Sequence, residues 1–128
     1  MLEHHYDGVQ AYCQSKLALV MFTFDLAEEL AGTGVTANCL HPGAVATGLG
    51  HNNGRLARLL ARALRPFFRT AVEGAATSVY LASAPAVERV SGRYFVDCRE
   101  ARSSPPSYDQ GLARRLWEVS ARMTGLAA

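Results

Sequence analysis

The hydrophobic and polar positions near the start of the chain predict a long helix. Residues 10–31 are good helix formers without Gly or Pro, and Gly32 and Gly34 follow, where a left-handed helix cap is usual. The apolar residues of this segment are Leu17, Leu19, Val20, Met21, Phe22, Phe24, Leu26 and Leu30. They cover much more than a single stripe, which predicts a central helix buried between a sheet and another layer of helices.

A short strand and a basic helix are predicted next. Residues 35–40 have the pattern of a buried strand that ends at His41-Pro42-Gly43, because proline cannot donate to a ladder and glycine permits a turn. Beyond a glycine-rich loop, residues 55–68 carry leucines at helical spacing together with a face of arginines. Pro66 ends or kinks this helix.

The last third of the chain predicts a helix, a strand and a final helix. Thr70 and Glu73 form a capping box that opens a helix to about residue 83, and residues 91–98 have the pattern of a second strand. Ser107 and Gln110 suggest another capping box, which opens a helix to about residue 123. The predicted apolar stripe of that helix is Leu112, Leu116, Val119 and Met123.

This order of elements is typical of an α/β protein with parallel strands. With 128 residues and 49% apolar residues, the chain has the size of one domain. A parallel sheet is normally covered on both faces and contains several strands, however, and only two are predicted. We therefore expect residues 1–128 to form a single incomplete domain.

The composition excludes several classes of function. The net charge is only +2, which does not favour nucleic-acid binding. Three widely spaced cysteines without a Cys-x-x-Cys pair argue against a disulfide framework and a zinc site, and they fit a reducing, cytoplasmic setting. His4 and His5 have no third ligand beside them, so no metal site is expected.

Membrane association is possible but not favoured. The longest strongly apolar run, residues 17–22, is much shorter than the roughly 20 residues that a spanning helix needs. The basic helix at residues 55–69 could lie on an anionic membrane surface, but it is short and contains no lysine.

Tyr12 and Lys16 are the main candidates for chemistry. Four residues apart on a helix, their side chains lie on one face about one turn apart. A nearby fixed positive charge favours the phenolate form of tyrosine, so such a tyrosine can protonate a carbonyl oxygen or deprotonate an alcohol. The alternative is structural, with the lysine only shielding a partly exposed aromatic ring.

Several segments together carry a family resemblance. They are Tyr12-Cys-Gln-Ser-Lys16-Leu-Ala, Val35-Thr-Ala-Asn-Cys-Leu, His41-Pro42-Gly43 with Thr47, Gly92-Arg-Tyr-Phe-Val-Asp-Cys98, and Leu116-Trp-Glu-Val-Ser120. In order and spacing, these segments resemble the second half of short-chain dehydrogenases/reductases. The last two are similar to the retinol dehydrogenase-like branch of that family.

The resemblance implies a fold and a site. The fold would be the C-terminal part of a Rossmann-like doubly wound parallel sheet without the N-terminal βαβ units. Tyr12 would be the catalytic acid/base, and Lys16 would hydrogen-bond the nicotinamide ribose of NADP or NAD. The Pro42-Gly43 turn would lie by the nicotinamide, with the Val45 backbone and the Thr47 hydroxyl holding the carboxamide or a nearby phosphate. The segment that covers the substrate would present Leu56, Leu59, Leu60, Leu64 and Phe67.

Two functions remain open from the sequence. The first is an oxidoreductase, in a longer chain, that acts on an apolar alcohol, aldehyde or ketone. The family's Gly-rich turn and catalytic serine are not found before Tyr12, so the 128 residues alone are expected to be inactive. The second is a truncated, non-catalytic module that forms a homo-oligomer through the Tyr12 helix.

Four further residues are expected to be structural. Asn38 would satisfy backbone groups, and His41 would support the Pro-Gly turn. Cys13 would pack as a small buried hydrophobe, and Trp117 would lie in the core.

Overall fold

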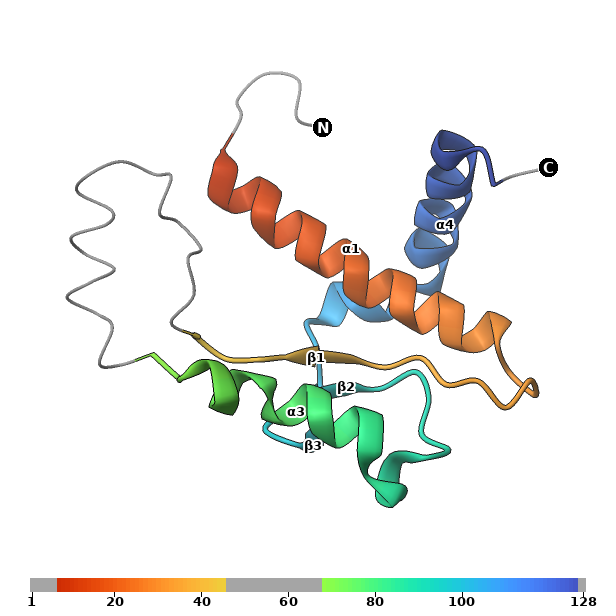
Figure 1. The fold of residues 1–128 in the computed structure, drawn as a ribbon. Helices are drawn as coiled ribbons and strands as arrows, with labels where there is room; N and C mark the ends of the chain where they lie inside the picture. Colours follow the sequence, from red (N-terminus) through yellow and green to blue (C-terminus); the bar gives the residue numbers. More distant parts are fainter. Residues whose placement is uncertain (1–6, 46–67, 127–128) are drawn as a thin grey trace.

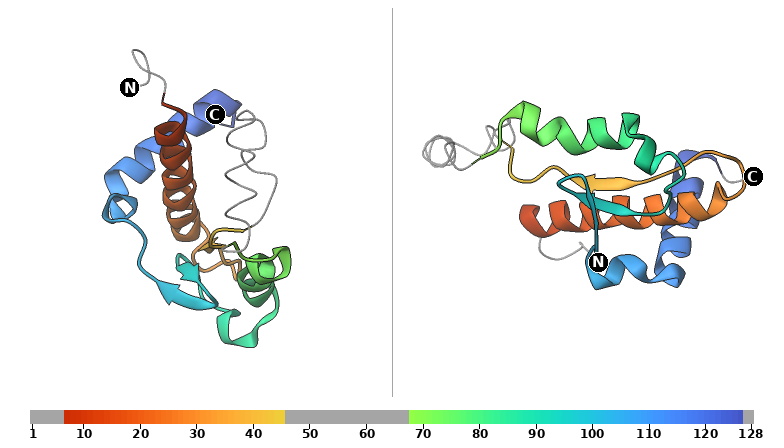
Figure 2. Two further views of the ribbon diagram at one scale, coloured as in Figure 1. Left: turned by 90° about the vertical axis from the view of Figure 1, so that its left-hand side faces the viewer. Right: turned by 90° about the horizontal axis from the view of Figure 1, so that it is seen from below.

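A three-stranded sheet with helices on both faces lies at the centre of the computed structural model, which describes residues 7–45 and 68–126 (Figure 1). The helices are α1 (Gly8–Glu29), α3 (Ala71–Ser83) and α4 (Gln110–Thr124). The strands are β1 (Cys39–His41), β2 (Tyr94–Val96) and β3 (Arg99–Ala101), and two 3-10 turns are η2 (Pro85–Val87) and η3 (Pro105–Tyr108). Seen from below, α3 covers one face of the sheet and α1 lies on the other (Figure 2).

Helix α1 confirms the long helix predicted from the sequence. It begins at Gly8 because the Asp7 carboxylate caps it, accepting hydrogen bonds from Val9 N at 2.9 Å and Gln10 N at 3.3 Å. Gly32 follows its end with a φ of +79°, as expected for a glycine near a helix C-terminus.

The expected burial of α1 was wrong for the described part of the chain. Only Met21 and Asp25 of this helix are buried, and Leu19 is 56% exposed. A helix of 22 residues is about 33 Å long, whereas each strand has three residues and spans about 10 Å. The described sheet is therefore too short to cover the N-terminal half of α1.

The sheet is mixed, so the fully parallel sheet that was predicted is confirmed only in part. Strand β1 pairs in parallel with β2, with Leu40 opposite Phe95, and β2 pairs antiparallel with β3. The second predicted strand, residues 91–98, contains β2 and the turn of a hairpin that continues into β3. Asp97 and Cys98 form its two-residue turn with φ values of +52° and +59°, the conformation that tight hairpins require at both central positions.

Side chains continue the contact between the first two strands where the ladder ends. The predicted strand at residues 35–40 begins only at Cys39, because Asn38 instead uses its amide group. Its Nδ2 donates to Val90 O at 2.6 Å, and its Oδ1 accepts from Arg93 N at 3.0 Å. The expected structural role of Asn38 is confirmed.

Helix α3 begins and ends as predicted. Thr70 Oγ1 accepts from Glu73 N at 3.2 Å, and Glu73 Oε2 accepts from Thr70 N at 2.7 Å, which completes the capping box. Pro85 then starts the 3-10 turn η2, since proline cannot continue the helix.

Helix α4 was predicted with the wrong cap and the wrong face. Its N-cap is Asp109, which accepts from Leu112 N at 2.9 Å, whereas Ser107 donates to Ser104 O within η3. The buried face lies one position beyond the predicted stripe. It contains the buried Ala113 and also Trp117, whose ring stacks on Phe22 of α1 at 5.0 Å between centroids.

Within residues 7–45 and 68–126, no helix is both long enough and apolar enough to cross a bilayer.

Candidate functional site

Tyr12 and Lys16 lie one turn apart on the N-terminal half of α1, as their spacing predicted. Lys16 Nζ is 5.3 Å from the centroid of the Tyr12 ring, within the range of a cation–π interaction. The Tyr12 side chain is 48% exposed. Among the described residues, neither the Tyr12 hydroxyl nor the Lys16 ammonium takes part in a hydrogen bond or ion pair.

The residues between this pair do not extend the site. Ser15 Oγ donates to Tyr12 O at 2.7 Å, so its hydroxyl satisfies the backbone of its own helix. Cys13 was expected to be buried, but it is exposed because the described elements leave this end of α1 uncovered.

The second part of the site is the turn after β1, at residues 42–45. Gly43 has a φ of +79°, and its N–H donates to Nδ1 of His41 at 2.9 Å. The expected structural role of His41 is therefore confirmed. The turn follows the carboxyl end of β1 and lies at the same end of the molecule as the N-terminal half of α1 (Figures 1 and 2). Ligands bind at this edge of open parallel sheets.

Arg69 and Asp97 support this turn, and sequence reasoning did not find them. Arg69 N donates to Ala44 O at 2.8 Å, and Val45 forms an isolated parallel bridge with Arg69. The Arg69 guanidinium donates two hydrogen bonds to the Asp97 carboxylate, and these bonds hold the pKa of Asp97 below its ordinary value. In the sequence, the feature that distinguishes these two residues is their position: Arg69 precedes a predicted helix, and Asp97 lies near the end of a predicted strand.

The available donors fit a nicotinamide dinucleotide. A phenol hydroxyl and an ammonium group are exposed at the end of the molecule where the Pro42–Gly43 backbone turns, and ribose hydroxyls and a carboxamide bind such groups. Val45, the last residue of this turn, packs against Gly74, where an added Cβ would lie 2.5 Å from Val45 Cγ2. Thr47 and the predicted substrate-covering residues (Leu56, Leu59, Leu60, Leu64 and Phe67) lie outside the described residues.

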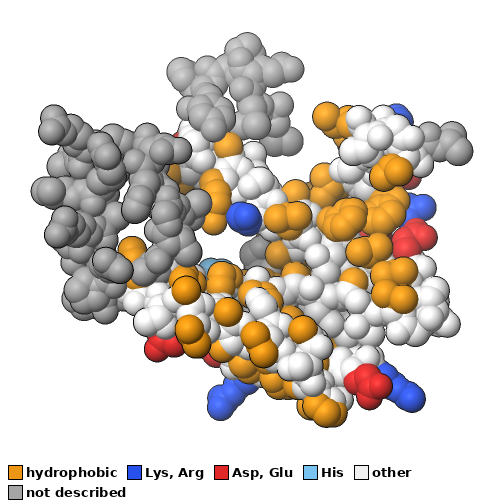
Figure 3. Space-filling model, in the orientation of Figure 1, with side chains coloured by type: hydrophobic (Ala, Val, Ile, Leu, Met, Phe, Trp, Pro, Cys, Tyr) orange, Lys and Arg blue, Asp and Glu red, His pale blue; other side chains and the backbone are white. Residues whose placement is uncertain are grey.

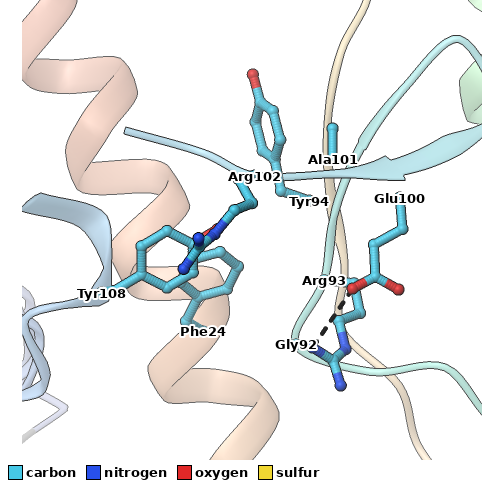
Figure 4. Close-up of a pocket in the computed structure, with 8 residues that line it drawn as sticks. All are labelled: Phe24, Gly92, Arg93, Tyr94, Glu100, Ala101, Arg102 and Tyr108. Atoms are coloured by element: carbon cyan, nitrogen blue, oxygen red, sulfur yellow. Dashed lines mark ion pairs between the residues drawn. The ribbon is translucent and has the colours of Figure 1, made fainter. Parts of the chain in front are cut away.

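A cavity of about 430 Å³ lies elsewhere in the molecule (Figure 4). Its lining residues are Phe24, Gly92, Arg93, Tyr94, Glu100, Ala101, Arg102 and Tyr108. Phe24 is twelve residues beyond Tyr12 on α1, about 18 Å along the helix. The cavity is therefore separate from the Tyr12 site.

The cysteines do not form a metal site in the described part of the chain. All three are free, and burial raises the pKa of the Cys39 thiol to about 11, which keeps it protonated near neutral pH. Over residues 7–45 and 68–126, no group of three or more His, Cys, Asp or Glu side chains could hold a metal ion.

Comparison with known proteins places these features in context. The sequence model of the short chain dehydrogenase family matches residues 3–56. The chain is 49% identical to human retinol dehydrogenase 14 over 127 residues, which cover 97% of the chain and 38% of that protein. It is 46% identical to mouse retinol dehydrogenase 13 (95% of the chain, 38% of that protein). It is 45% identical to human retinol dehydrogenase 12 (97% and 39%), so it spans about two fifths of the length of these relatives.

Proposed function

This chain belongs to the short-chain dehydrogenase/reductase family, and from that premise we propose that it carries the acid/base residue of an NAD(P)-dependent oxidoreductase within a longer chain. The substrate would be a small apolar alcohol, aldehyde or ketone. The observation that carries this proposal is the Tyr12–Lys16 pair on α1, in which the ammonium lies 5.3 Å from the centroid of the exposed phenol ring.

The chemistry of the chain's own residues follows from their positions. Tyr12 Oη would give its proton to a substrate carbonyl oxygen during reduction and take it from the alcohol during oxidation. Lys16, whose ammonium lies over the Tyr12 ring, would hydrogen-bond the nicotinamide ribose. When bound, the nicotinamide cofactor supplies or accepts the hydride. The Pro42–Val45 turn and Thr47 would hold its nicotinamide end, and the leucines of residues 56–64 with Phe67 would cover an apolar substrate.

The relatives suggest the kind of substrate. Proteins named as retinol dehydrogenases are 45% and 49% identical to the chain over nearly all of its residues. We therefore propose a retinol-like substrate, that is, an apolar molecule that carries an alcohol or aldehyde group. Further expectations are a cytoplasmic location, from the three free cysteines, and no nucleic-acid partner, from the net charge of +2.

The first experiment measures the mass of the native protein. The second measures the turnover of that protein with NADP or NAD. The Tyr12→Phe variant should lower turnover between about 10²- and 10⁴-fold, the usual contribution of a general acid/base. Tyr108→Phe is the matched control, since Tyr108 is 47% exposed and Tyr12 is 48% exposed. Unchanged turnover in Tyr12→Phe would show that Tyr12 is not the acid/base.

A second candidate function is association without catalysis. It is favoured by the exposed apolar residues on α1, which include Val9 and Leu19. Such a surface invites a second copy of the chain. Light scattering on the purified 128-residue chain tests this function, and a monodisperse monomer would rule it out.

A further inference from the structure

Arg69 and Asp97 join two elements beneath the Pro42–Val45 turn. Arg69 directly precedes Thr70, the N-cap of α3, and Asp97 directly follows β2. The guanidinium and the carboxylate form two parallel hydrogen bonds, of which Nη2 to Oδ2 measures 3.0 Å. A two-fold contact of this kind fixes orientation as well as distance. The start of α3 is thereby tied to the carboxyl end of the sheet.

The same arginine holds the turn through its backbone and its side chain. Its N–H donates to Ala44 O at 2.8 Å, and it pairs with Val45 as a parallel bridge. Its Nε lies 2.9 Å from the point where a Cβ on Gly43 would stand. The Arg69 side chain therefore lies against Gly43, and the Arg69 backbone pairs with Ala44 and Val45.

Each partner of the pair has a neighbouring residue that is hydrogen-bonded within or to α3. The capping box holds the chain next to Arg69, with Glu73 Oε2 accepting from Thr70 N at 2.7 Å. The hairpin that contains Asp97 is held by Cys98 N, which donates to Thr77 Oγ1 at 3.2 Å. Because both sides are anchored to α3, the pair forms a stiff support for the turn.

Stability alone is a poor account of this pair. The side chains are 39% and 55% exposed, and exposed ion pairs contribute little to folding free energy. The pair instead fixes the position of Arg69, which contacts the turn at Gly43, Ala44 and Val45.

We propose that Arg69, held by Asp97, is a positioning residue for the cofactor: it sets the position of the Pro42–Val45 turn and so the affinity for the nicotinamide end of NAD(P). This rests on the proposed function, since the turn's cofactor role comes from the family. Arg69 acts through the turn.

The test uses the native protein and the variants Arg69→Met, Asp97→Asn and the double variant. Arg69→Lys keeps the charge but loses the paired hydrogen bonds. This variant replaces the others in the binding measurements if they do not fold. The matched control is Arg93→Met with Glu100→Gln, which removes an exposed ion pair of 3.4 Å that does not touch the turn. The measurements are the dissociation constants of NADPH and NADH by fluorescence titration, and hydrogen exchange at the amides of residues 43 and 69.

Each single variant should raise the dissociation constant between about ten- and a hundredfold, the scale of a small misplacement of a binding group. The double variant should bind the dinucleotide no more weakly than the single variants. The dissociation constant of Arg69→Lys should lie between those of the wild-type protein and the other single variants. The amides of residues 43 and 69 should exchange faster, and the control should change neither quantity.

The outcomes separate this proposal from the function on which it rests. If wild-type protein binds the dinucleotide and the variants bind equally well with unchanged amide exchange, the pair is only a surface ion pair and this proposal alone is wrong. If wild-type protein binds neither dinucleotide, the proposed function is wrong too. A Tyr12→Phe variant that binds NADPH normally but does not turn over supports the proposed function independently of Arg69.

Discussion

Gly43 is subject to two separate constraints at the scale of the single residue. Its φ of +79° is a conformation that residues with a Cβ rarely adopt. A Cβ at this position would also lie 2.9 Å from Arg69 Nε. Gly32 has the same φ of +79° but nothing within 4 Å of its added Cβ, so the chain contains a natural comparison for the two effects.

The Gly32→Ala variant should therefore cost only the backbone strain, about 1–2 kcal/mol. Gly43→Ala should cost more, because Arg69 must also move. Urea denaturation of both variants measures the free energies of unfolding. The double variant Gly43→Ala/Arg69→Ala removes the Arg69 side chain that the new Cβ would meet. It should therefore recover part of the additional loss in free energy of unfolding that Gly43→Ala shows over Gly32→Ala. Equal losses in the two single variants would mean that the Arg69 contact costs nothing.

The candidate site was predictable only where it depends on local sequence. Tyr12 and Lys16 are four residues apart, and helical geometry alone brings them together. Arg69 and Asp97 are 28 residues apart, and they meet only because α3 and the β2–β3 hairpin pack together. No local pattern marks such a pair before the fold is known.

At the scale of elements, α1 and α4 are joined by a charged cluster around a buried carboxylate. Asp25 is buried, and its Oδ2 has no hydrogen-bond partner in the described structure. Burial raises the pKa of Asp25, and the neighbouring Glu28, Glu29 and Glu118 raise it further, while Arg114 opposes the shift. The ionised form of Asp25 therefore destabilises the contact between the two helices.

Asp25→Asn should consequently stabilise the protein near neutral pH. Because the folded-state pKa is raised, the stability linked to protonated Asp25 is fully present below its ordinary value of 3.8 and is lost as pH rises through the folded-state pKa. The gain in Asp25→Asn should thus be seen at pH 7 and should vanish under acid conditions. Thermal unfolding monitored through the chain's single tryptophan, Trp117, measures it, because its ring stacks on Phe22 of α1.

The matched control for this prediction is Glu29→Gln, which removes an exposed partner of Arg114. It should be neutral or slightly destabilising at pH 7, since an exposed ion pair contributes about 0–1 kcal/mol. A loss of stability in Asp25→Asn at pH 7 would mean that the attraction to Arg114 outweighs burial.

The elements that could be predicted carry strong local signals, and the others depend on context. The capping box at Thr70 and Glu73 fixed the start of α3 correctly. Strand β3 was missed because its turn places Asp97 and Cys98 at positive φ, where Gly or Asn is the usual signal. The cap of α4 was misplaced because Ser107 and Asp109 are both capping residues, and only η3, which uses the Ser107 hydroxyl, decides between them.

At the scale of the whole molecule, the described part of the chain leaves much apolar surface exposed. Hydrophobic side chains spread over α3 on the face seen in Figure 3. Among the residues of α3, Val72 is 82% exposed and Val79 is 60% exposed. On the opposite face of the sheet, α1 exposes Val9 and Leu19. Strand β1 pairs only with β2 among the described strands, so its other edge has free backbone groups. These features fit a segment of a larger fold.

A complementation experiment tests that interpretation. The part of human retinol dehydrogenase 14 that the chain does not match, 62% of its length because 38% is covered, should bind the 128-residue chain and form a one-to-one complex. The driving force is burial of apolar surface and pairing of the free edge of β1. Size-exclusion chromatography with light scattering would detect the complex, and NADPH titration would report whether it forms a cofactor site.

A charge on the surface to be covered should prevent this assembly. Leu19→Asp should weaken the complex strongly, since α1 would have to bury an unpaired carboxylate. Leu112→Asp is the control, because Leu112 is also an exposed leucine but lies on α4. If Leu19→Asp assembles as well as the control, the exposed surface of α1 around Leu19 is not the surface that the rest of the fold covers. If neither protein forms a complex, the chain does not complete the fold of this relative, and association between its own copies becomes the better account of its apolar surface.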